Sequence, residues 1–153
     1  MKHEFVNTNS KVIAIDFDGT IVEHDYPRIG KEMLFAFATI KELHKKGHKL
    51  ILNTYRTGSL LEEAVEYCKK NGVEFFAVNK NYPEEEVNEK TPRKLDVDVF
   101  IDDRNIGGFM GWSSVWQTLH PEGGEFNHIL KNPEAHHNFK QEEKSFFKKI
   151  FGK

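Results

Sequence analysis

Two aspartate pairs are the residues most able to do chemistry in this chain. Asp16 and Asp18 lie in the run DFDGT, and Asp102 and Asp103 are adjacent in the run IDD. Carboxylates that share a strand end repel each other unless a cation or a hydrogen-bond donor lies between them. Magnesium prefers hard oxygen ligands of this kind. The two pairs together therefore predict a magnesium site, whereas a lone DxD run is more typical of a solvated turn or a cap.

The elements that would position these acids are four short apolar runs. They cover residues 11–18, 49–55, 74–79 and 97–103. Their nearly continuous apolar centres favour strands that are buried on both faces. Asp16 and Asp18 end the first strand, Thr54 ends the second, and the adjacent acid pair ends the fourth.

Helical patterns separate the predicted strands. One covers residues 31–46 and stops at Gly47; its expected inner face is Leu34, Phe37, Ile40 and His44. The next begins at a capping-box pattern of Ser59 and Glu62 and ends at Gly72; its expected inner face is Leu61, Ala64, Val65 and Cys68. This alternation predicts a doubly wound α/β sheet with its crevice beyond the carboxyl ends of the strands.

Four ordered segments resemble the motifs of the haloacid dehalogenase (HAD) superfamily: DFDGT, Thr54, Lys94 and the IDD run. The resemblance covers residues 11–108. Residues 101–108 are similar to the IDDRN-GG segment of small capless bacterial HAD hydrolases. The resemblance implies a three-layer, mostly parallel, Rossmann-like sheet without a cap domain, and a magnesium-dependent phosphatase that acts on a small phosphomonoester.

The resemblance also implies residue roles. Asp16 matches the nucleophile that forms an aspartyl-phosphate, and Asp18 matches the general acid and base. The metal ligands would be the Asp16 carboxylate, the Asp18 backbone carbonyl and Asp103, with Asp102 orienting the metal-bound waters. Thr54 matches the hydroxyl that binds a phosphoryl oxygen, and Lys94 matches the ammonium that offsets negative charge.

Several of these assignments have alternatives. Lys94 precedes the fourth strand and reaches the crevice only if its loop crosses that rim, so Lys80, directly after the third strand, is a rival. Arg56 follows Thr54 closely and is expected either to bind substrate, with Gly19 and Thr20, or to be a surface arginine paired with Glu62 or Glu63.

Composition limits the other classes of function. The chain has 153 residues, a net charge of -2 and one cysteine, Cys68, so it fits a single domain and cannot form an internal disulfide. No signal-peptide pattern or membrane-span length is present, so we expect a soluble cytoplasmic protein that does not bind nucleic acid. The sequence leaves open a homo-oligomer.

Residues 120–153 form an expected C-terminal extension of the single domain 1–153. A packed helix is expected around Trp112 and Trp116, and solvent-exposed positions are expected for His120, His128, His136 and His137. Residues 144–153 are basic and apolar, with one helical stripe of Phe146, Phe147, Ile150 and Phe151, which favours docking onto the domain or onto a second subunit over a membrane surface.

Two functional alternatives remain at this point. A phosphoacceptor module resembling a response-regulator receiver uses a similar set of acids, a hydroxyl, a lysine and magnesium, but its adjacent acid pair follows the first strand instead of the fourth. A non-catalytic metal-binding scaffold is the other alternative.

Overall fold

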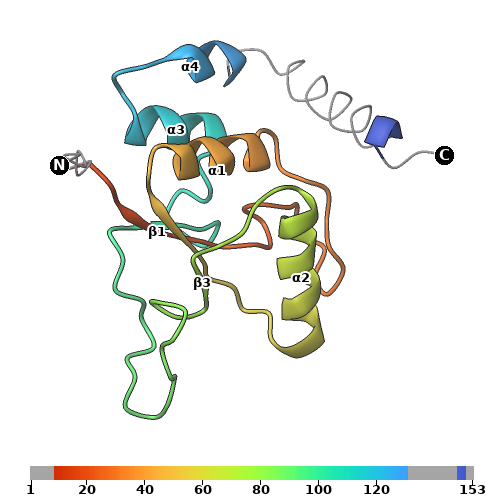
Figure 1. Cartoon of the computed structure of the whole chain (residues 1–153), viewed down its shortest axis with the longest axis vertical. Helices are drawn as coiled ribbons and strands as arrows, with labels where there is room; N and C mark the ends of the chain where they lie inside the picture. The colour runs from red at the N-terminus through yellow and green to blue at the C-terminus, as the bar shows by residue number, and fades with distance from the viewer. Residues whose placement is uncertain (1–8, 131–147, 151–153) are drawn as a thin grey trace.

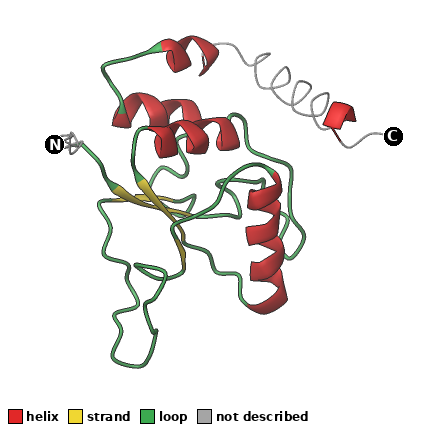
Figure 2. Cartoon of the chain, viewed as in Figure 1, coloured by secondary structure: helices red, strands yellow, loops and turns green. Residues whose placement is uncertain are grey.

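The four apolar runs form one parallel sheet. In the computed structural model, which describes residues 9–130 and 148–150, the strands are β1 (Val12–Ile15), β2 (Lys49–Leu52), β3 (Ala77–Val78) and β4 (Val99–Ile101). Their order across the sheet is β3-β2-β1-β4, and every pair is parallel. Each strand lies inside the run predicted for it (Figures 1 and 2).

The pairing register aligns the carboxyl ends of β1, β2 and β4. Ile15 of β1 pairs with Leu52 of β2 on one side and with Ile101 of β4 on the other. The hydrogen bonding continues one residue further, because the Asp16 amide donates to the Ile101 carbonyl at 2.9 Å. The residues that follow β1, β2 and β4 therefore emerge at one edge of the sheet, as expected for parallel strands.

The helices cover only one face of this sheet, so the predicted three-layer arrangement is wrong for the described residues. Alternate strand residues point to opposite faces. Ile13, Ile15, Leu50 and Leu52 belong to a large core cluster that includes buried residues from every named helix. The second cluster, on the other face, consists of Ala14, Ile51, Ala77 and Leu95 and contains no helical residue.

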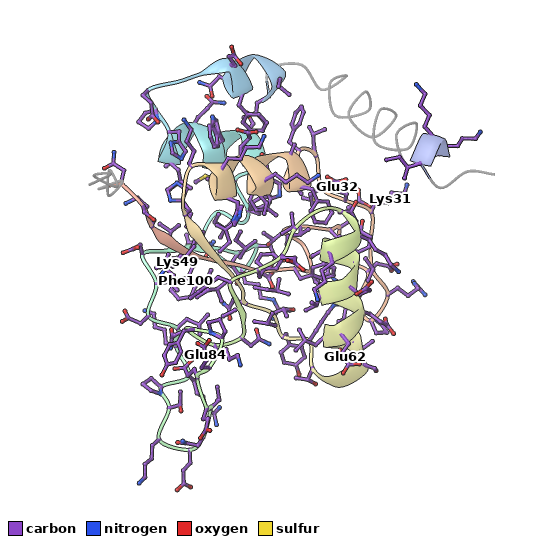
Figure 3. All side chains as sticks on the ribbon, viewed as in Figure 1. Lys31, Glu32, Lys49, Glu62, Glu84 and Phe100 are labelled. Carbon is purple, nitrogen blue, oxygen red and sulfur yellow. The ribbon has the colours of Figure 1, made fainter. Side chains whose placement is uncertain are left out.

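The loop of residues 79–98 covers part of that second face. It contributes Leu95 and Val97 to the apolar cluster and has no helix of its own. Its turns are held by side chains: Glu85 accepts hydrogen bonds from Asn81, and Thr91 accepts one from the Asn88 amide. Lys49 and Phe100 lie on this same face by register and remain exposed (Figure 3).

Helix α1 (Ala36–Lys45) is shorter than predicted. Residues before it form the edge of a small flap instead, since Val22 bridges to Glu32 and the Met33 amide donates to the Ile21 carbonyl. Phe37 and Ile40 are buried, but Leu34 and His44 are exposed, so the predicted inner face is only half right. Gly47 ends the helix as expected, with a φ of 87°.

Helix α2 (Gly58–Lys70) confirms its predicted inner face. Ala64 and Cys68 are buried, and Leu61 and Val65 pack against the same core. The predicted capping box is wrong, because Thr57 is the N-cap residue and makes no side-chain capping bond. The helix stops before Gly72, which has a φ of 82°.

Helices α3 (Trp112–Leu119) and α4 (Glu125–Leu130) close the helical layer. Trp112 and Trp116 are buried, as predicted, and Phe126 and Leu130 of α4 join the same core. Of the predicted C-terminal stripe, Phe146, Phe147 and Phe151 lie outside the described residues, as do His136 and His137. Among the described residues, no helix is both long and apolar enough to cross a membrane.

The prediction of an exposed His120 is wrong, because this residue is buried against His48. The two Nε2 atoms lie 3.0 Å apart. His48 Nδ1 accepts the Lys11 backbone amide at 3.0 Å, and His120 Nδ1 lies 2.8 Å from the Glu122 carboxylate. Since the Lys11 amide can only donate, His48 Nδ1 is an acceptor, and a proton on His48 Nε2 would point at His120 Nε2.

Candidate metal centre and active site

Three of the predicted acids meet at the carboxyl edge of the sheet. One carboxylate oxygen from each of Asp16, Asp102 and Asp103 lies within 4.8 Å of the other two. Asp16 follows β1, and the other two follow β4, the strand that pairs with β1. Among the described residues, no lysine or arginine forms an ion pair with these three carboxylates.

Asp16 is the most perturbed acid of the three. Burial raises its pKa from 3.8 to about 7, and the negative charges of Asp102 and Asp103 act in the same direction. Thr20 donates its hydroxyl hydrogen to Asp16 Oδ2 at 3.2 Å. A carboxyl group that keeps its proton up to neutral pH, beside two other acids, is typical of a site built for a cation or for catalysis.

The donor set fits magnesium. Hard carboxylate oxygens from two strand ends converge on one place, and burial together with the neighbouring acids raises the pKa of Asp16, a cost that a divalent cation would offset. The backbone carbonyl of Asp18, the remaining expected ligand, stays a prediction.

The turn after β1 brings the two acid pairs together. Gly19 has a φ of 81°, and a Cβ at this position would collide with the Asp103 carboxylate. Any side chain here would therefore both strain the backbone and push the acid pairs apart. Gly19 is a structural requirement of the acidic cluster, and the predicted contact with substrate is not needed to explain it.

Thr20 supports the Asp16 side chain through a hydrogen bond. Its side chain is buried and does not line the crevice, so the predicted role in substrate binding is wrong. Its hydroxyl binds Asp16, and its carbonyl accepts the Trp112 indole N–H at 2.8 Å. Helix α3 thus fixes the residue that orients Asp16.

The loop after β4 is held by Asp102. Its Oδ1 accepts the Arg104 amide at 2.8 Å, and its carbonyl accepts the Asn105 side-chain amide at 2.7 Å. One Asp102 oxygen is therefore engaged within its own turn. This supports the expectation that Asp102 plays a secondary part at the metal.

Asp18 and Arg56 form a buried ion pair that the sequence did not predict. Arg56 Nε and Nη2 bind the two Asp18 oxygens at 2.7 Å each. The Arg56 side chain is fully buried and is absent from the lining of the crevice. Neither expectation for Arg56 therefore describes it: it neither contacts the open crevice nor pairs with Glu62 or Glu63 at the surface.

The acids open into a crevice of about 670 Å³. Asp16, Asp18, Asp102 and Asp103 line it together with the predicted Thr54 and with Arg104, which borders the acid pair in the sequence; the other lining residues are His24, Tyr26, Asn53 and Tyr55. Tyr26 and Tyr55 meet edge to face at its mouth, with ring centroids 6.3 Å apart. Single aromatic and polar residues carry no spacing signal, so the sequence did not indicate His24, Tyr26, Asn53 or Tyr55.

Thr54 is positioned by a residue that the sequence did not single out. Its backbone amide donates to Asn79 Oδ1 at 2.8 Å, and its hydroxyl oxygen accepts the Arg56 amide at 3.2 Å. Asn79 follows β3 and has a φ of 53°, a conformation that asparagine tolerates better than most residues. This contact holds the end of β2 against the end of β3.

Neither candidate lysine lines the crevice. The Lys94 ammonium lies over the Phe100 ring, 5.9 Å from its centroid, on the sheet face that carries no helix. The condition set for Lys94, that its loop crosses the rim, is therefore not met in this structure. Lys80 lies beside Asn79 in a separate cavity of the 79–98 loop. Arg104 is the cationic side chain that the structure places in the crevice lining.

Comparisons with known proteins find a similar solved structure that covers most of the chain. No family model and no curated protein matches the chain. Among solved structures, the chain is similar to a conserved protein from Bacteroides thetaiotaomicron, with 48% sequence identity and a TM-score of 0.70 over 77% of this chain and 96% of that chain. The chain belongs to the family of that conserved protein.

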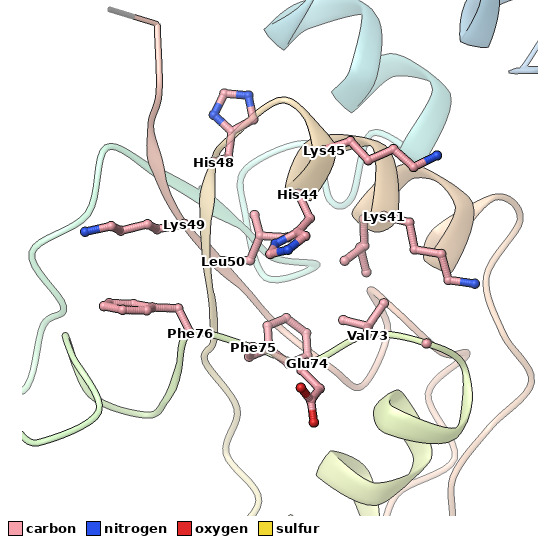
Figure 4. Close-up of a pocket in the computed structure, with 12 residues that line it drawn as sticks. Lys41, His44, Lys45, His48, Lys49, Leu50, Val73, Glu74, Phe75 and Phe76 are labelled. Carbon is pink, nitrogen blue, oxygen red and sulfur yellow. The ribbon is translucent and has the colours of Figure 1, made fainter. Parts of the chain in front are cut away.

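A second large cavity of this chain differs in character from the crevice. It also measures about 670 Å³ and lies between the end of α1 and the segment that enters β3. Its walls include Leu50, Val73 and Phe75, while Lys41 and Lys49 point to opposite sides (Figure 4). Its charged groups do not converge on a common position, unlike the carboxylates of the crevice.

Proposed function

We propose that the chain is a magnesium-dependent phosphohydrolase that cleaves a phosphomonoester through an aspartyl-phosphate on Asp16. The observation that carries this proposal is the convergence of Asp16, Asp102 and Asp103 in a crevice that Asp18 also lines. The ordered resemblance of these residues to HAD motifs supports the same chemistry.

In the first step, an Asp16 carboxylate oxygen attacks phosphorus and the bond from phosphorus to the leaving oxygen breaks. Asp18 gives its proton to that oxygen, which departs as an alcohol. Thr54, at the end of β2, holds a phosphoryl oxygen through its hydroxyl. Magnesium, when bound by the acid cluster, supplies positive charge that offsets the repulsion between carboxylate and phosphate.

In the second step, Asp18 removes a proton from water, and the water oxygen attacks phosphorus. The bond between phosphorus and Asp16 breaks, which releases inorganic phosphate and restores both carboxyl groups. Asp16 reacts only when ionised, so its raised pKa limits the cation-free protein at neutral pH. A bound cation would lower that pKa and make the nucleophile available.

One observation favours a second candidate, a phosphoacceptor module. Both oxygens of Asp18 are bound by Arg56. If this pair prevents Asp18 from activating water, Asp16 would accept a phosphoryl group and keep it. The two functions differ in turnover, since a phosphatase releases many leaving alcohols and many phosphates per chain, whereas a phosphoacceptor releases about one leaving alcohol and retains the phosphoryl group.

The test uses the full chain with magnesium and p-nitrophenyl phosphate. We expect multiple turnovers that a chelator abolishes, and no detectable hydrolysis by Asp16→Asn. Asp96→Asn, at an exposed aspartate outside the crevice, is the matched control and should keep the wild-type rate. Hydrolysis that survives in Asp16→Asn would exclude Asp16 as the nucleophile, and a single turnover would favour the phosphoacceptor.

A further inference from the structure

Arg56 connects two walls of the crevice from beneath. On the basis of the proposed function, we propose that Arg56 is a positioning residue that fixes the Asp18 carboxylate toward the crevice and ties the segment 23–30 to it. In this role the buried Arg56 does not contact the substrate and affects proton transfer only through Asp18.

The Arg56 guanidinium is committed on all its nitrogens. Nε and Nη2 each bind an Asp18 oxygen at 2.7 Å. Nη1 donates to the Pro27 carbonyl at 2.9 Å, and Nη2 donates to the Arg28 carbonyl at 2.7 Å. The planar fork of a guanidinium matches a carboxylate edge in this way, whereas a lysine would supply only a point charge.

Two aromatic rings hold the guanidinium in this place. Its central carbon lies 5.1 Å from the Phe17 ring centroid and 5.3 Å from the Tyr26 ring centroid. Phe17 belongs to the DFDGT run, and Tyr26 belongs to the segment 23–30 and lines the crevice. The arginine is therefore clamped by the same two segments that its hydrogen bonds join, and it has no free donor edge for a substrate phosphate.

The pairing leaves part of the Asp18 carboxylate open toward the crevice. A carboxylate offers about four acceptor positions, and the guanidinium occupies one on each oxygen. The Asp18 side chain is 12% exposed and lines the crevice, so its remaining positions can face a leaving group. Without Arg56, the carboxyl group would rotate about its side-chain bonds, and proton transfer would lose the orientation on which its rate depends.

The test separates reactions that need an acid from reactions that do not. Glycerol phosphate has a poor leaving group that requires protonation, and p-nitrophenyl phosphate has a good one that does not. We expect Arg56→Met to lower kcat for glycerol phosphate by about 100-fold, in the range of general acid catalysis. Release of the first nitrophenolate should remain fast, and later turnovers should be slow, because the second step still needs Asp18 as a base.

A double-mutant cycle with Asp18→Asn shows whether Arg56 acts through Asp18. If it does, adding Arg56→Met to Asp18→Asn should cost less than about 3-fold, since effects of residues that act as a unit do not add. Arg93→Met, at an exposed arginine of the 79–98 loop, is the control and should leave the ratio of the two rates unchanged. An equal loss in the first release of nitrophenolate and in glycerol phosphate hydrolysis, or multiplicative losses in the double variant, would overturn the inference.

Hydrogen exchange tests the connection to the segment 23–30 without an activity measurement. Arg56→Met should speed exchange at least 10-fold in this segment, including the Glu23 amide that donates to the Lys31 carbonyl, while α2 amides remain protected. Unchanged protection would refute the connection. If the wild-type chain hydrolyses neither phosphate, the proposed phosphatase function is wrong, and the role of Arg56 in it falls as well. If the wild type is active but the Arg56 variants do not behave as expected, only the role of Arg56 is wrong.

Discussion

The two ends of the sheet treat buried ionisable groups in opposite ways. At the carboxyl end, Asp16 lies beside Asp102 and Asp103, and the three share no cationic partner among the described residues. At the other end, His48 and His120 form a chain in which every proton has an acceptor, from the Lys11 amide to Glu122.

The difference separates a site from a structural network. A satisfied polar network is complete and needs no ligand. The acidic cluster, in which the pKa of Asp16 is raised, lacks a cationic partner among the described residues, so we expect a bound cation to lower its free energy. Substitutions and pH changes at the two ends of the sheet test this contrast.

Neutralising an acid of the cluster should have the largest effect. We expect Asp103→Asn to lower magnesium-dependent hydrolysis by about 10³-fold, because a metal contributes several kcal/mol of charge stabilisation in such reactions. The variant should also lose the increase in melting temperature that magnesium gives the wild type. His120→Asn should keep that increase. A full magnesium response in Asp103→Asn would contradict the assigned metal site.

Stability in a chelator should fall as pH rises from about 4 to about 7. The folded chain keeps the Asp16 proton up to a pKa of about 7, whereas the unfolded chain releases it near 3.8. The folded state therefore binds more protons across this window, so raising the pH costs it up to a few kcal/mol. Urea unfolding of wild type and Asp16→Asn at several pH values measures the difference. A pH slope that persists unchanged in Asp16→Asn would show that it has another origin.

The histidine pair should give the opposite pH dependence. Burial and the neighbouring His120 lower the pKa of His48 below its ordinary 6.5. The unfolded chain then binds more protons below pH 6.5, so stability is lost as pH falls through this range. His120→Ala should remove part of this dependence and destabilise the fold by about 1–3 kcal/mol, since it leaves a buried His48 N–H unpaired. Magnesium-dependent activity at pH 8 should persist; its loss would show that the two ends are coupled.

Removing the Thr54 hydroxyl should have the smallest effect. One hydrogen bond to a phosphoryl oxygen contributes about 1–2 kcal/mol, so Thr54→Ala should lower the rate roughly 10-fold. Thr54→Ser keeps the hydroxyl and is the matched control. A loss as large as that of Asp103→Asn would mean that Thr54 does more than hold phosphate.

The acidic cluster could be predicted from the sequence because its position depends only on where the parallel strands end. Asp16, Asp102 and Asp103 follow apolar runs that could only be buried strands, and parallel strands end at one edge. The same argument correctly placed Thr54 in the crevice. The sequence did not indicate that Thr20 binds Asp16 or that Asn79 positions Thr54, because these contacts depend on where α3 and β3 pack.

The errors arose where tertiary partners override local pattern. Arg56 is buried only because Asp18, Phe17 and Tyr26 surround it, and His120 is buried only because His48 meets it. Doubly wound topology predicted a second helical layer. The 79–98 segment instead contains Pro83 and Pro92 and satisfies its backbone through asparagine and threonine turns, which favours a loop.

The central claim is that Asp16 carries the phosphoryl group, and trapping that species tests it most directly. The wild-type chain is mixed with magnesium and substrate, quenched in acid and treated with borohydride, which converts a phosphorylated aspartate to homoserine. Peptide mass spectrometry then locates the change. The account predicts homoserine at position 16 and none in Asp16→Asn. Homoserine at another aspartate, or none while wild-type turnover continues, would contradict it.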